Sequence, residues 1–390
     1  MDNCERKITI LALGGGGCRI MKEFVSGHET GQFDLLAVDS DLESLQNSGL
    51  PEERWLQAGR LLRSGRGCGG DIISGQQALA NERKQLNTLL NGSDVLIIVA
   101  GLGGGLASGG MPVILGVAAK LHITTAVLVS LPFNMEGFQR RQLADDKIKN
   151  DILPIADAVI ALPNDLLFAT MDAEVSMAEA LRRSDQELAR TLFSLASIMG
   201  GANLFNADFS AFTGILKRRH TLCALGTAMV DNGVDAASRA MDKLLASPLL
   251  GGPETLDTAD AVTFSLLGGP ELSMGTARAV LDLCSRQIDP EQEKKVLLGA
   301  ASGEEFAGKI MLTALVVRYL DNPAKSSSGR KRSFIRENRE NASDGGEQLF
   351  LDLAVENKGI MENTTPVIID GEDLDVPTFR RRNMVVDMGK

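Results

Sequence analysis

The stretch that decides the fold is residues 94–110, which read DVLIIVAGLGGGLASGG. Residues 94–101 form an apolar run that ends in glycine, which is typical of a buried strand of a parallel sheet. Three glycines, Gly103–Gly105, follow at once, and residues 112–120 then carry the apolar pattern of a helix. A strand, a glycine turn and a helix in this order predict a βαβ unit.

The same arrangement recurs on either side of this stretch. Residues 7–13 read as a short buried strand, the glycines Gly14–Gly17 follow, and a helical pattern begins near Arg19. Further strands are expected at residues 33–41, 124–132 and 156–165. Strands that alternate with helices predict a doubly wound, Rossmann-like parallel sheet, which binds its ligands at the carboxyl ends of the strands.

Beyond this α/β part the sequence predicts a different organisation. Residues 177–199 show helical spacing without Gly or Pro, which indicates a long central helix joining two domains. A second α+β unit follows, with strands at 261–269 and 309–317, and the polar, charged residues after Pro323 read as a flexible linker. The expected domains are 1–175 (nucleotide binding), 176–202 (central helix), 203–322 (second α+β domain), 323–371 (linker) and 372–390 (terminal interaction peptide).

Composition excludes several functions. The net charge of −11 disfavours nucleic-acid binding, because phosphate backbones need a basic surface. No apolar run is long enough to cross a membrane, and the polar start of the chain does not resemble a signal peptide. The five cysteines form no CxxC pair or Cys/His cluster, so we expect no metal site in the protein and reduced thiols in a cytoplasm.

Three glycine clusters carry the strongest functional signal. They lie at 14–17, 65–70 and 103–105, and glycine lets a backbone approach a ligand and present its amides to an anion. The only near match to a P-loop, Gly303–Ile310, lacks the hydroxyl residue that would bind magnesium. A dinucleotide fingerprint starts well at Gly14 and Gly16 but has Arg19 as its last position, with Asp39 available for a ribose. An NAD-type enzyme therefore stays open as an alternative, although it leaves two glycine clusters unexplained.

Eight segments together resemble the FtsZ/tubulin family. They are ALGGGG (12–17), GRGCGGD (65–71), AGLGGGLASGG (100–110), LPFNMEG (131–137), LPNDLL (162–167), ASPLL (246–250), LLGGPELSM (266–274) and DLDVPTF (373–379). The resemblance spans nearly the whole chain except the linker. It implies a GTPase domain that binds GTP or GDP with Mg²⁺, and a protein that assembles head to tail into filaments in bacterial cell division.

The resemblance also implies roles for individual residues. The phosphates would be held by Gly14, Gly15, Gly16, Gly17, Gly103, Gly104, Gly105 and Ser108, and the γ-phosphate would face Gly67, Cys68 and Gly69. The further positions expected to bind the nucleotide are Arg19, Leu106, Ala107 and Gly109. Glu136 and Arg140 would contact the ribose and phosphates, while Asn164 and Asp185 would read the base. A carboxylate accepts hydrogen bonds from guanine N1–H and N2–H₂ together, whereas the N1 of adenine is an acceptor and would be repelled.

The catalytic pattern of the family departs here in one position. In the family a loop of the second domain reaches the γ-phosphate of the neighbouring subunit, and its pattern N-x-D-F-x-D reads Asn206-Ala207-Asp208-Phe209-Ser210-Ala211. Asn206 and Asp208 are the expected catalytic residues, but Ala211 replaces the second acid. Loss of a positioned acid or base costs about 10²–10⁴-fold in rate, so we expect slow or conditional hydrolysis.

Other departures lie around the expected nucleotide. Leu106, Ala107, Arg19, Leu181 and Asp39 replace the family's Thr, Gly, Asn, Phe and Asn, and Arg19 and Asp39 could compensate each other as an ion pair. A non-hydrolysing scaffold paralogue is therefore a second alternative.

The end of the chain implies a partner. Residues Asp375–Arg382 resemble the family's terminal peptide, which docks on membrane adaptors and division regulators, with Phe379 as apolar anchor. Arg380 stands where the family has Leu. The expected partners are further copies of the chain and such an adaptor, at the division site.

Overall fold

The computed structural model describes residues 6–60, 66–172, 174–200, 209–217, 220–252, 254–288, 294–320, 368–369 and 372–373. The chain divides into two compact units, Met1–Leu353 and Ala354–Lys390. In the second unit a short hairpin pairs β11 (Ile368–Ile369) with β12 (Glu372–Asp373). The domain boundaries expected from the sequence stay a prediction.

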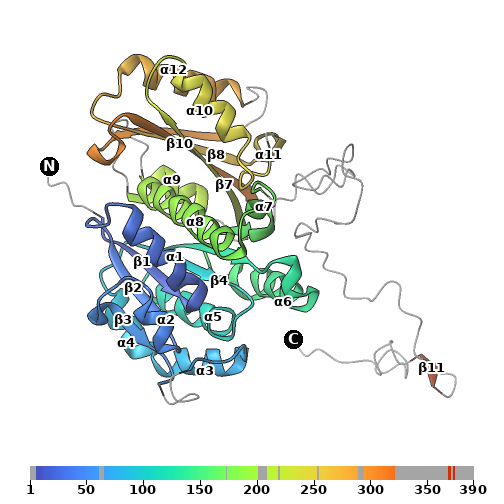
Figure 1. The fold of residues 1–390 in the computed structure, drawn as a ribbon. Helices are drawn as coiled ribbons and strands as arrows, with labels where there is room; N and C mark the ends of the chain where they lie inside the picture. Colours follow the sequence, from blue (N-terminus) through green and yellow to red (C-terminus); the bar gives the residue numbers. More distant parts are fainter. Residues whose placement is uncertain are drawn as a thin grey trace, which may run out of the picture. The chain divides into compact units, whose positions relative to one another are not determined.

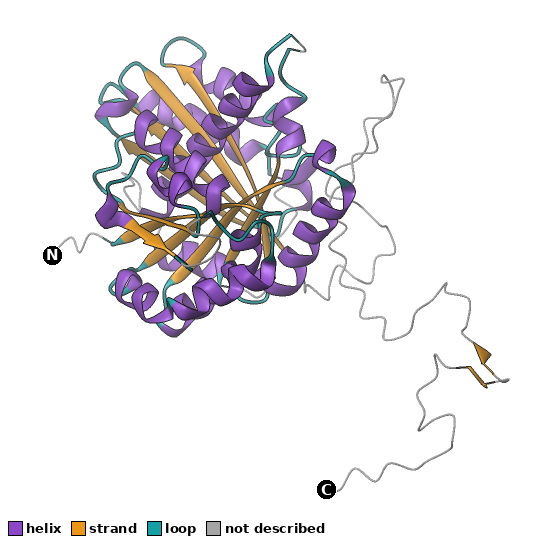
Figure 2. Ribbon diagram, turned by 60° about the horizontal axis from the view of Figure 1, so that its bottom comes forward, coloured by secondary structure: helices purple, strands orange, loops and turns teal. Residues whose placement is uncertain are grey.

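A ten-stranded sheet runs through the first unit in the order β3-β2-β1-β4-β5-β6-β7-β10-β8-β9 (Figures 1 and 2). Its first six strands are β1 (Ile8–Leu13), β2 (Asp34–Asp39), β3 (Trp55–Gln57), β4 (Val95–Gly101), β5 (Thr124–Leu131) and β6 (Ala158–Pro163). These strands are parallel throughout, as the alternation of apolar runs and helical patterns predicts.

The second half of the sheet is mixed. It contains β7 (Thr221–Asp231), β8 (Ala261–Gly268), β9 (Lys295–Ser302) and β10 (Lys309–Tyr319). Strand β10 pairs antiparallel with both β7 and β8, and β8 pairs parallel with β9. Strands β8 and β10 match the predicted ones, whereas β7 and β9 were not predicted, because glycine and alanine interrupt their apolar patterns.

Helices cover both faces of the sheet (Figure 2). The half of the sheet formed by β1–β6 carries α1 (Gly14–Gly27), α2 (Leu42–Gln46), α3 (Ile72–Asn81), α4 (Arg83–Leu90), α5 (Gly105–Lys120), α6 (Phe138–Lys147) and α7 (Asn164–Phe168). The other half carries α9 (Phe209–Leu216), α10 (Ala236–Leu245), α11 (Glu254–Thr258) and α12 (Met274–Arg286). Short 3-10 helices occur at Glu52–Arg54, Asn134–Glu136 and Glu304–Phe306, and a π-helical turn occurs at Ile148–Ile152.

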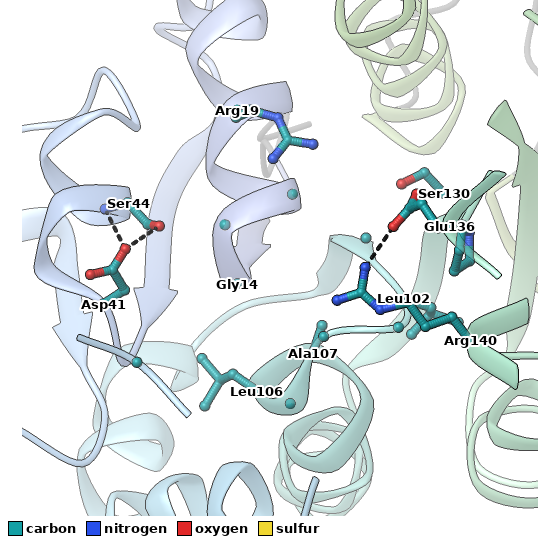
Figure 3. Close-up of a pocket in the computed structure, with 18 of the residues that line it drawn as sticks. Gly14, Arg19, Asp41, Ser44, Leu102, Leu106, Ala107, Ser130, Glu136 and Arg140 are labelled. Carbon is teal, nitrogen blue, oxygen red and sulfur yellow. Dashed lines mark hydrogen bonds and ion pairs between the residues drawn. The ribbon is translucent and has the colours of Figure 1, made fainter. Parts of the chain in front are cut away.

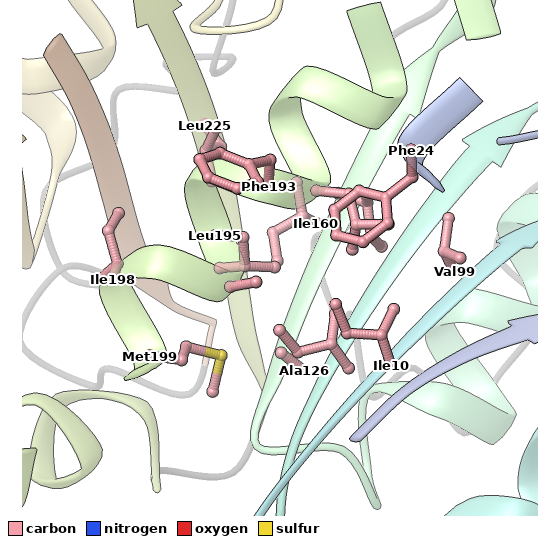
Figure 4. Close-up of a cluster of buried hydrophobic side chains, with 14 of the residues drawn as sticks. Ile10, Phe24, Val99, Ala126, Ile160, Phe193, Leu195, Ile198, Met199 and Leu225 are labelled. Carbon is pink, nitrogen blue, oxygen red and sulfur yellow. The ribbon is translucent and has the colours of Figure 1, made fainter. Parts of the chain in front are cut away.

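The predicted central helix is α8 (Met177–Gly200), which lies between the two halves in Figure 1. Its apolar face belongs to a core that also contains residues of β1, β4, β5 and β7, and Phe193 and Phe24 stand close together there (Figure 4). Burial of such large side chains stabilises the fold by roughly 1.5–3 kcal/mol each. The helix thereby holds both halves through its side chains.

Two helices begin earlier than the apolar pattern predicts. Helix α1 starts at Gly14 rather than near Arg19, and α5 starts at Gly105 rather than at Pro112. Gly14–Gly17 therefore form the first turn of α1, and Gly105 is the first residue of α5. Their backbone amides point out of the helix ends at the carboxyl edge of the sheet, which places the candidate site.

Candidate functional site

A cavity of about 620 Å³ lies at the carboxyl ends of β1, β2, β4, β5 and β6. Its walls come from the two early helix starts, the loops after β2 and β5, the loop 66–69 and the first turns of α7 and α8. Figure 3 labels ten of these residues around the space. This is the edge at which the sequence predicts a ligand.

The glycine cluster at 14–17 meets the end of β4, which leads into the cluster at 103–105, backbone to backbone. A Cβ on Gly16 would stand 3.0 Å from the Cα and N of Gly101, and Gly14 and Gly103 have φ angles of +73° and +96°. Neither α1 nor α5 has an N-cap side chain that accepts a hydrogen bond from its first turn. Two helix N-termini with amides left over therefore converge on one cavity, and such termini favour an anion.

The glycine cluster at 65–70 closes the cavity beside β2 through its residues 66–69. Gly67 and Gly69 have φ angles of +77° and +57°, and Arg66 forms an isolated antiparallel bridge with Asp41. The Cys68 Sγ lies 3.3 Å from the Ser40 Oγ and is buried. All three clusters predicted to face one ligand are thus at one site.

An ion pair forms the wall after β5. Arg140 donates to Glu136 with an N–O distance of 2.8 Å, and Glu136 also accepts a hydrogen bond of 3.0 Å from the amide of Phe133 (Figure 3). Both side chains line the cavity and stay partly exposed. The pair can offer a carboxylate oxygen to a sugar hydroxyl and guanidinium N–H groups to an anion.

Asn164 carries a polar atom that the described protein does not satisfy. It lines the cavity at the first residue of α7, and its Oδ1 is buried without a hydrogen-bond donor among the described residues. A buried acceptor without a partner costs about 1–3 kcal/mol. A ligand that brings an N–H or O–H group to this position would remove that cost.

The ion pair expected between Arg19 and Asp39 does not form. The Arg19 Nε instead donates to the Asp185 Oδ2 at 3.2 Å, across from α1 to α8. Asp39 is buried, and its Oδ1 accepts from the amides of Ser40 at 2.6 Å and Asp41 at 3.2 Å. Burial raises the pKa of both carboxyl groups. Arg19 lowers the pKa of Asp185, and the two amide hydrogen bonds lower that of Asp39, but in each case burial is the larger effect.

Most of the predicted binding residues line the cavity. They are Gly14, Gly15, Gly16, Arg19, Gly67, Cys68, Gly69, Gly103, Gly104, Gly105, Leu106, Ala107, Glu136, Arg140 and Asn164. Asp185 stands behind Arg19 and is not itself part of the wall.

Three predicted residues lie behind the wall and hold it. A Cβ on Gly17 would stand 2.4 Å from the Val99 carbonyl oxygen, so Gly17 lets α1 pack on β4. Ser108 is buried and accepts a 3.1 Å hydrogen bond from the Gly103 amide. Gly109 packs against the backbone of α3. These three residues are not among those that line the cavity, and in the structure they set the packing behind its loops. Their contact with a nucleotide stays a prediction.

Several lining residues were missed. They are Ser40, Asp41, Ser44, Arg66, Gly101, Leu102, Ser130, Leu131, Pro132, Phe133, Met135 and Met177, while Asp39 and Leu181 were weighed only as departures. Most of them directly follow a buried strand, so their place at the carboxyl edge could have found them. Asp41 accepts from both the amide and the hydroxyl of Ser44 and caps α2.

The expected catalytic residues Asn206 and Asp208 lie outside the described residues, as does the tail peptide Asp375–Arg382. Ala211 is described: it is exposed on α9. Among the described residues no three His, Cys, Asp or Glu side chains gather as a metal site. No helix of the described chain is long and apolar enough to cross a membrane.

Comparison with models of known protein families gives a match over the first part of the chain. Residues 7–172 match the model of the Tubulin/FtsZ family GTPase domain. This match confirms the family resemblance and the predicted fold class.

Solved structures share the fold. An empty FtsZ dimer from M. jannaschii gives a TM-score of 0.72 at 24% identity, covering 81% of this chain and 89% of that chain. CetZ2 from Haloferax volcanii, in a GTPγS-bound protofilament, gives 0.64 at 22% identity and covers 82% and 96%. CetZ1 from the same organism, a GDP-bound monomer, gives 0.65 at 19% identity and covers 80% and 93%. At these identities the likeness establishes the fold.

Proposed function

We propose that this chain, whose residues 7–172 form a GTPase domain of the Tubulin/FtsZ family, binds GTP and GDP in the cavity and polymerises head to tail with slow GTP hydrolysis. The observation that carries the proposal is the convergence of two uncapped helix N-termini, α1 and α5, on one glycine-walled cavity. The family binds GTP and GDP, and the structural relatives include a GTPγS-bound protofilament and a GDP-bound monomer.

The walls suit the three parts of a nucleotide. The amides of Gly14–Gly16 and Gly103–Gly105 would hold the phosphates, with the 67–69 loop at their far end. Glu136 and Arg140 would contact the ribose. The unpartnered Oδ1 of Asn164 and the carboxylate of Asp185 accept hydrogen bonds, and guanine offers N–H donors on its N1 and N2 edge.

A magnesium ion would enter with the nucleotide. Mg²⁺ is usually held by substrate phosphates, waters and one or two carboxylates rather than by a protein cage. Asp39 and Asp41 are the carboxylates that line the phosphate end of the cavity, and both already accept protein hydrogen bonds. They fit a supporting role around a hydrated cation, which would supply charge neutralisation between phosphate oxygens.

Hydrolysis would need a neighbouring copy. The loop that contains Asn206 and Asp208 would reach the nucleotide of the next subunit, and this heterologous contact repeats into an open filament. Ala211 supplies no acid to that interface, so turnover should be slow while binding and assembly persist. A filament former of this kind would act in bacterial cell division, with Asp375–Arg382 as the docking peptide for an adaptor.

The first experiment combines three measurements on the full chain: GTP and GDP affinity, sedimentation, and phosphate release, all with magnesium. We expect micromolar or tighter GTP binding, pelleting that depends on GTP, and phosphate release well below that of an ordinary family member. Absence of guanine-nucleotide binding would overturn the proposal. Fast steady release would contradict only the slow-turnover part.

The variant Ala211→Asp tests the missing acid. It should raise phosphate release by about 10²-fold or more, because it restores a positioned carboxylate. Ala211→Asn is the matched control: it has nearly the same size but cannot act as a base. Equal turnover in both variants would instead favour the scaffold paralogue, which does not hydrolyse GTP whatever stands at position 211.

A further inference from the structure

Arg141 is a buried arginine behind the wall of the cavity, and the proposed function gives it no role. It follows Arg140 in α6, and neighbouring residues of an α-helix point about 100° apart. Arg140 therefore reaches the cavity, whereas Arg141 shares the buried face of the helix with Ala144 and is 8% exposed. Burying a charge is costly unless it is paired, so the partners of Arg141 indicate what it holds in place.

These partners lie on the loop and the helix that form the wall. The Arg141 Nη1 donates a 3.2 Å hydrogen bond to the carbonyl oxygen of Pro132, which follows β5, and lies 3.7 Å from the Asp165 Oδ2 of α7. On the other side its Nε lies 3.6 Å from the Asp145 Oδ1, and neither of these two atoms has a hydrogen-bond partner among the described residues. Arg141 thus makes its hydrogen bond to the loop rather than to its own helix.

Asp165 connects the same loop to α7. Its two carboxylate oxygens each accept a 3.2 Å hydrogen bond from the Asn134 amide, and the ring of Phe133 lies 4.3 Å from that of Phe168, measured between centroids. Arg141 contacts both sides of this junction, because one of its partners is in the loop and the other is in α7.

The loop carries the carboxylate that the proposed function places at the ribose. Pro132, Phe133 and Glu136 all line the cavity, and Glu136 accepts a 3.0 Å hydrogen bond from the Phe133 amide. The direction of the Glu136 side chain therefore depends on the backbone at residues 132–133, which is the backbone that Arg141 binds. A binding group reaches its ligand productively only when residues behind it hold its geometry.

We propose that Arg141 is a positioning residue for nucleotide binding, which ties the Pro132 carbonyl to Asp165 and thereby holds Glu136 within reach of a ribose hydroxyl. This inference rests on the proposed function and deepens it, because it names the residue that sets the preference for a sugar with free hydroxyl groups. Without the guanidinium the loop keeps its bond through Asn134 but loses the one at Pro132. The phosphate contacts would come from α1 and α5, which Arg141 does not hold.

The test measures affinities of the full chain for GTP and for 2′,3′-dideoxy-GTP in magnesium. The dideoxy analogue lacks both sugar hydroxyls and keeps the base and the three phosphates. The variants are Arg141→Met, which keeps an unbranched side chain without donors, Arg141→Lys, Glu136→Ala and the double variant Arg141→Met/Glu136→Ala. Lys147→Met is the matched control, because it removes one positive charge from the same helix and its ion pair is with Asp151.

The wild type should prefer GTP over the dideoxy analogue by about tenfold, the value of one hydrogen bond to a charged group. In Arg141→Met the affinity for GTP should fall by about tenfold while that for the analogue stays unchanged, so that the preference disappears as in Glu136→Ala. The double variant should bind GTP no more weakly than Glu136→Ala alone, because both residues act through one contact. Lys147→Met should behave as the wild type.

Arg141→Lys keeps the buried positive charge and guards against a failure of Arg141→Met to fold. Its preference for GTP should be intermediate, because an ammonium group lacks the planar fork with which a guanidinium reaches two acceptors. Melting temperatures without nucleotide show whether each variant is folded. If Arg141→Met is unfolded, a preference in Arg141→Lys equal to that of the wild type would overturn the inference.

Other results would also overturn the inference while leaving the proposed function intact. If Arg141→Met weakens GTP and the dideoxy analogue equally, Arg141 supports the site as a whole and does not position Glu136. The inference also fails if Arg141→Met changes neither affinity, or if the wild type binds GTP and the analogue equally well. A wild type that binds no guanine nucleotide would overturn the proposed function itself, and this inference with it.

Discussion

Gly109 of α5 lies directly against the backbone of Ile72 in α3, because a Cβ on Gly109 would stand 2.1 Å from the Ile72 carbonyl oxygen. A Cβ on the neighbouring Gly110 would likewise stand 2.1 Å from the Leu79 Cδ1. One glycine-rich motif therefore serves two purposes. Its first glycines wall the cavity, and its later ones let two helices approach closely behind it.

We predict that Gly109→Ala lowers the free energy of unfolding by about 1–3 kcal/mol, because the added methyl forces α3 and α5 apart. Gly116→Ala in the same helix is the matched control, since a Cβ there meets nothing within 4 Å. Alanine is the better helix former, so the control should be unchanged or up to about 1 kcal/mol more stable. Urea unfolding of both variants measures this, and similar values for the two would contradict the packing role.

The buried ring of His28 should make the stability of the fold depend on pH. It stacks on Phe193 with centroids 4.5 Å apart, and burial, aided by Arg190, lowers its pKa from 6.5 to about 4. The folded state therefore resists protonation that the unfolded state accepts. Its contribution is full above pH 6.5, decreases as the pH falls toward 4, and amounts to about 1–2 kcal/mol once solvent screening is allowed for.

The variant His28→Phe keeps an aromatic ring but does not titrate. Its melting temperature should therefore fall less than that of the wild type between pH 6.5 and 4. Parallel curves for the two proteins over this range would show that His28 does not cause the loss.

A substitution of Asn164 should lower the affinity for guanine nucleotides without lowering the stability of the nucleotide-free protein. Removing its amide in Asn164→Ala deletes the buried Oδ1 that lacks a donor, so the nucleotide-free protein should melt at the same or a higher temperature. Guanine-nucleotide affinity should nevertheless fall by about tenfold, the value of one lost hydrogen bond to a buried group. Thermal melts with and without GTP measure both effects, and a large loss of stability without nucleotide would mean that Asn164 is structural.

The central helix is joined to the second half of the sheet by a buried hydroxyl pair. The Ser194 Oγ of α8 and the Thr313 Oγ1 of β10 lie 2.5 Å apart, and each residue is 1% exposed. Ser194→Ala should cost about 1–3 kcal/mol, because it leaves Thr313 without its partner. The double variant Ser194→Ala/Thr313→Val should cost less than the sum of the singles, and additive costs in denaturant unfolding would rule out coupling.

Much of the fold follows from the sequence because its signals are local. The buried runs 7–13, 94–101 and 124–132 become β1, β4 and β5, and the uninterrupted helical pattern from Met177 becomes α8. The sequence pattern predicts the two helix starts too late, because glycine has a low helix propensity. The packing of α1 on the sheet and α8, and of α5 on α3, stabilises the glycines in the helices. Those contacts join residues far apart in the chain, so a local pattern does not show them.

The sequence likewise predicts which loops form the site, but not the exact position of each residue in it. Motif order identified three loops that line one cavity, but it could not distinguish Gly104, in the wall, from Gly109, behind it. It also paired Arg19 with Asp39, whereas the structure pairs it with Asp185 on α8. Which carboxylate an arginine reaches depends on helix packing across 166 residues of sequence, and neither charge nor spacing along the chain contains that information.

The short pairing of β6 with β7, where the two halves of the sheet meet, affects how the sheet can bend. Strands β6 and β7 are in register over only Val159↔Leu222 and Ile160↔Cys223, whereas β7 and β10 are in register along their full lengths from Thr221 to Asp231. Bending there breaks few backbone bonds, and its main cost is repacking the side chains around α8. We therefore expect the two halves of the sheet to be stiffer than the β6–β7 edge that joins them. A force applied across this edge should separate β6 from β7 before it deforms either half.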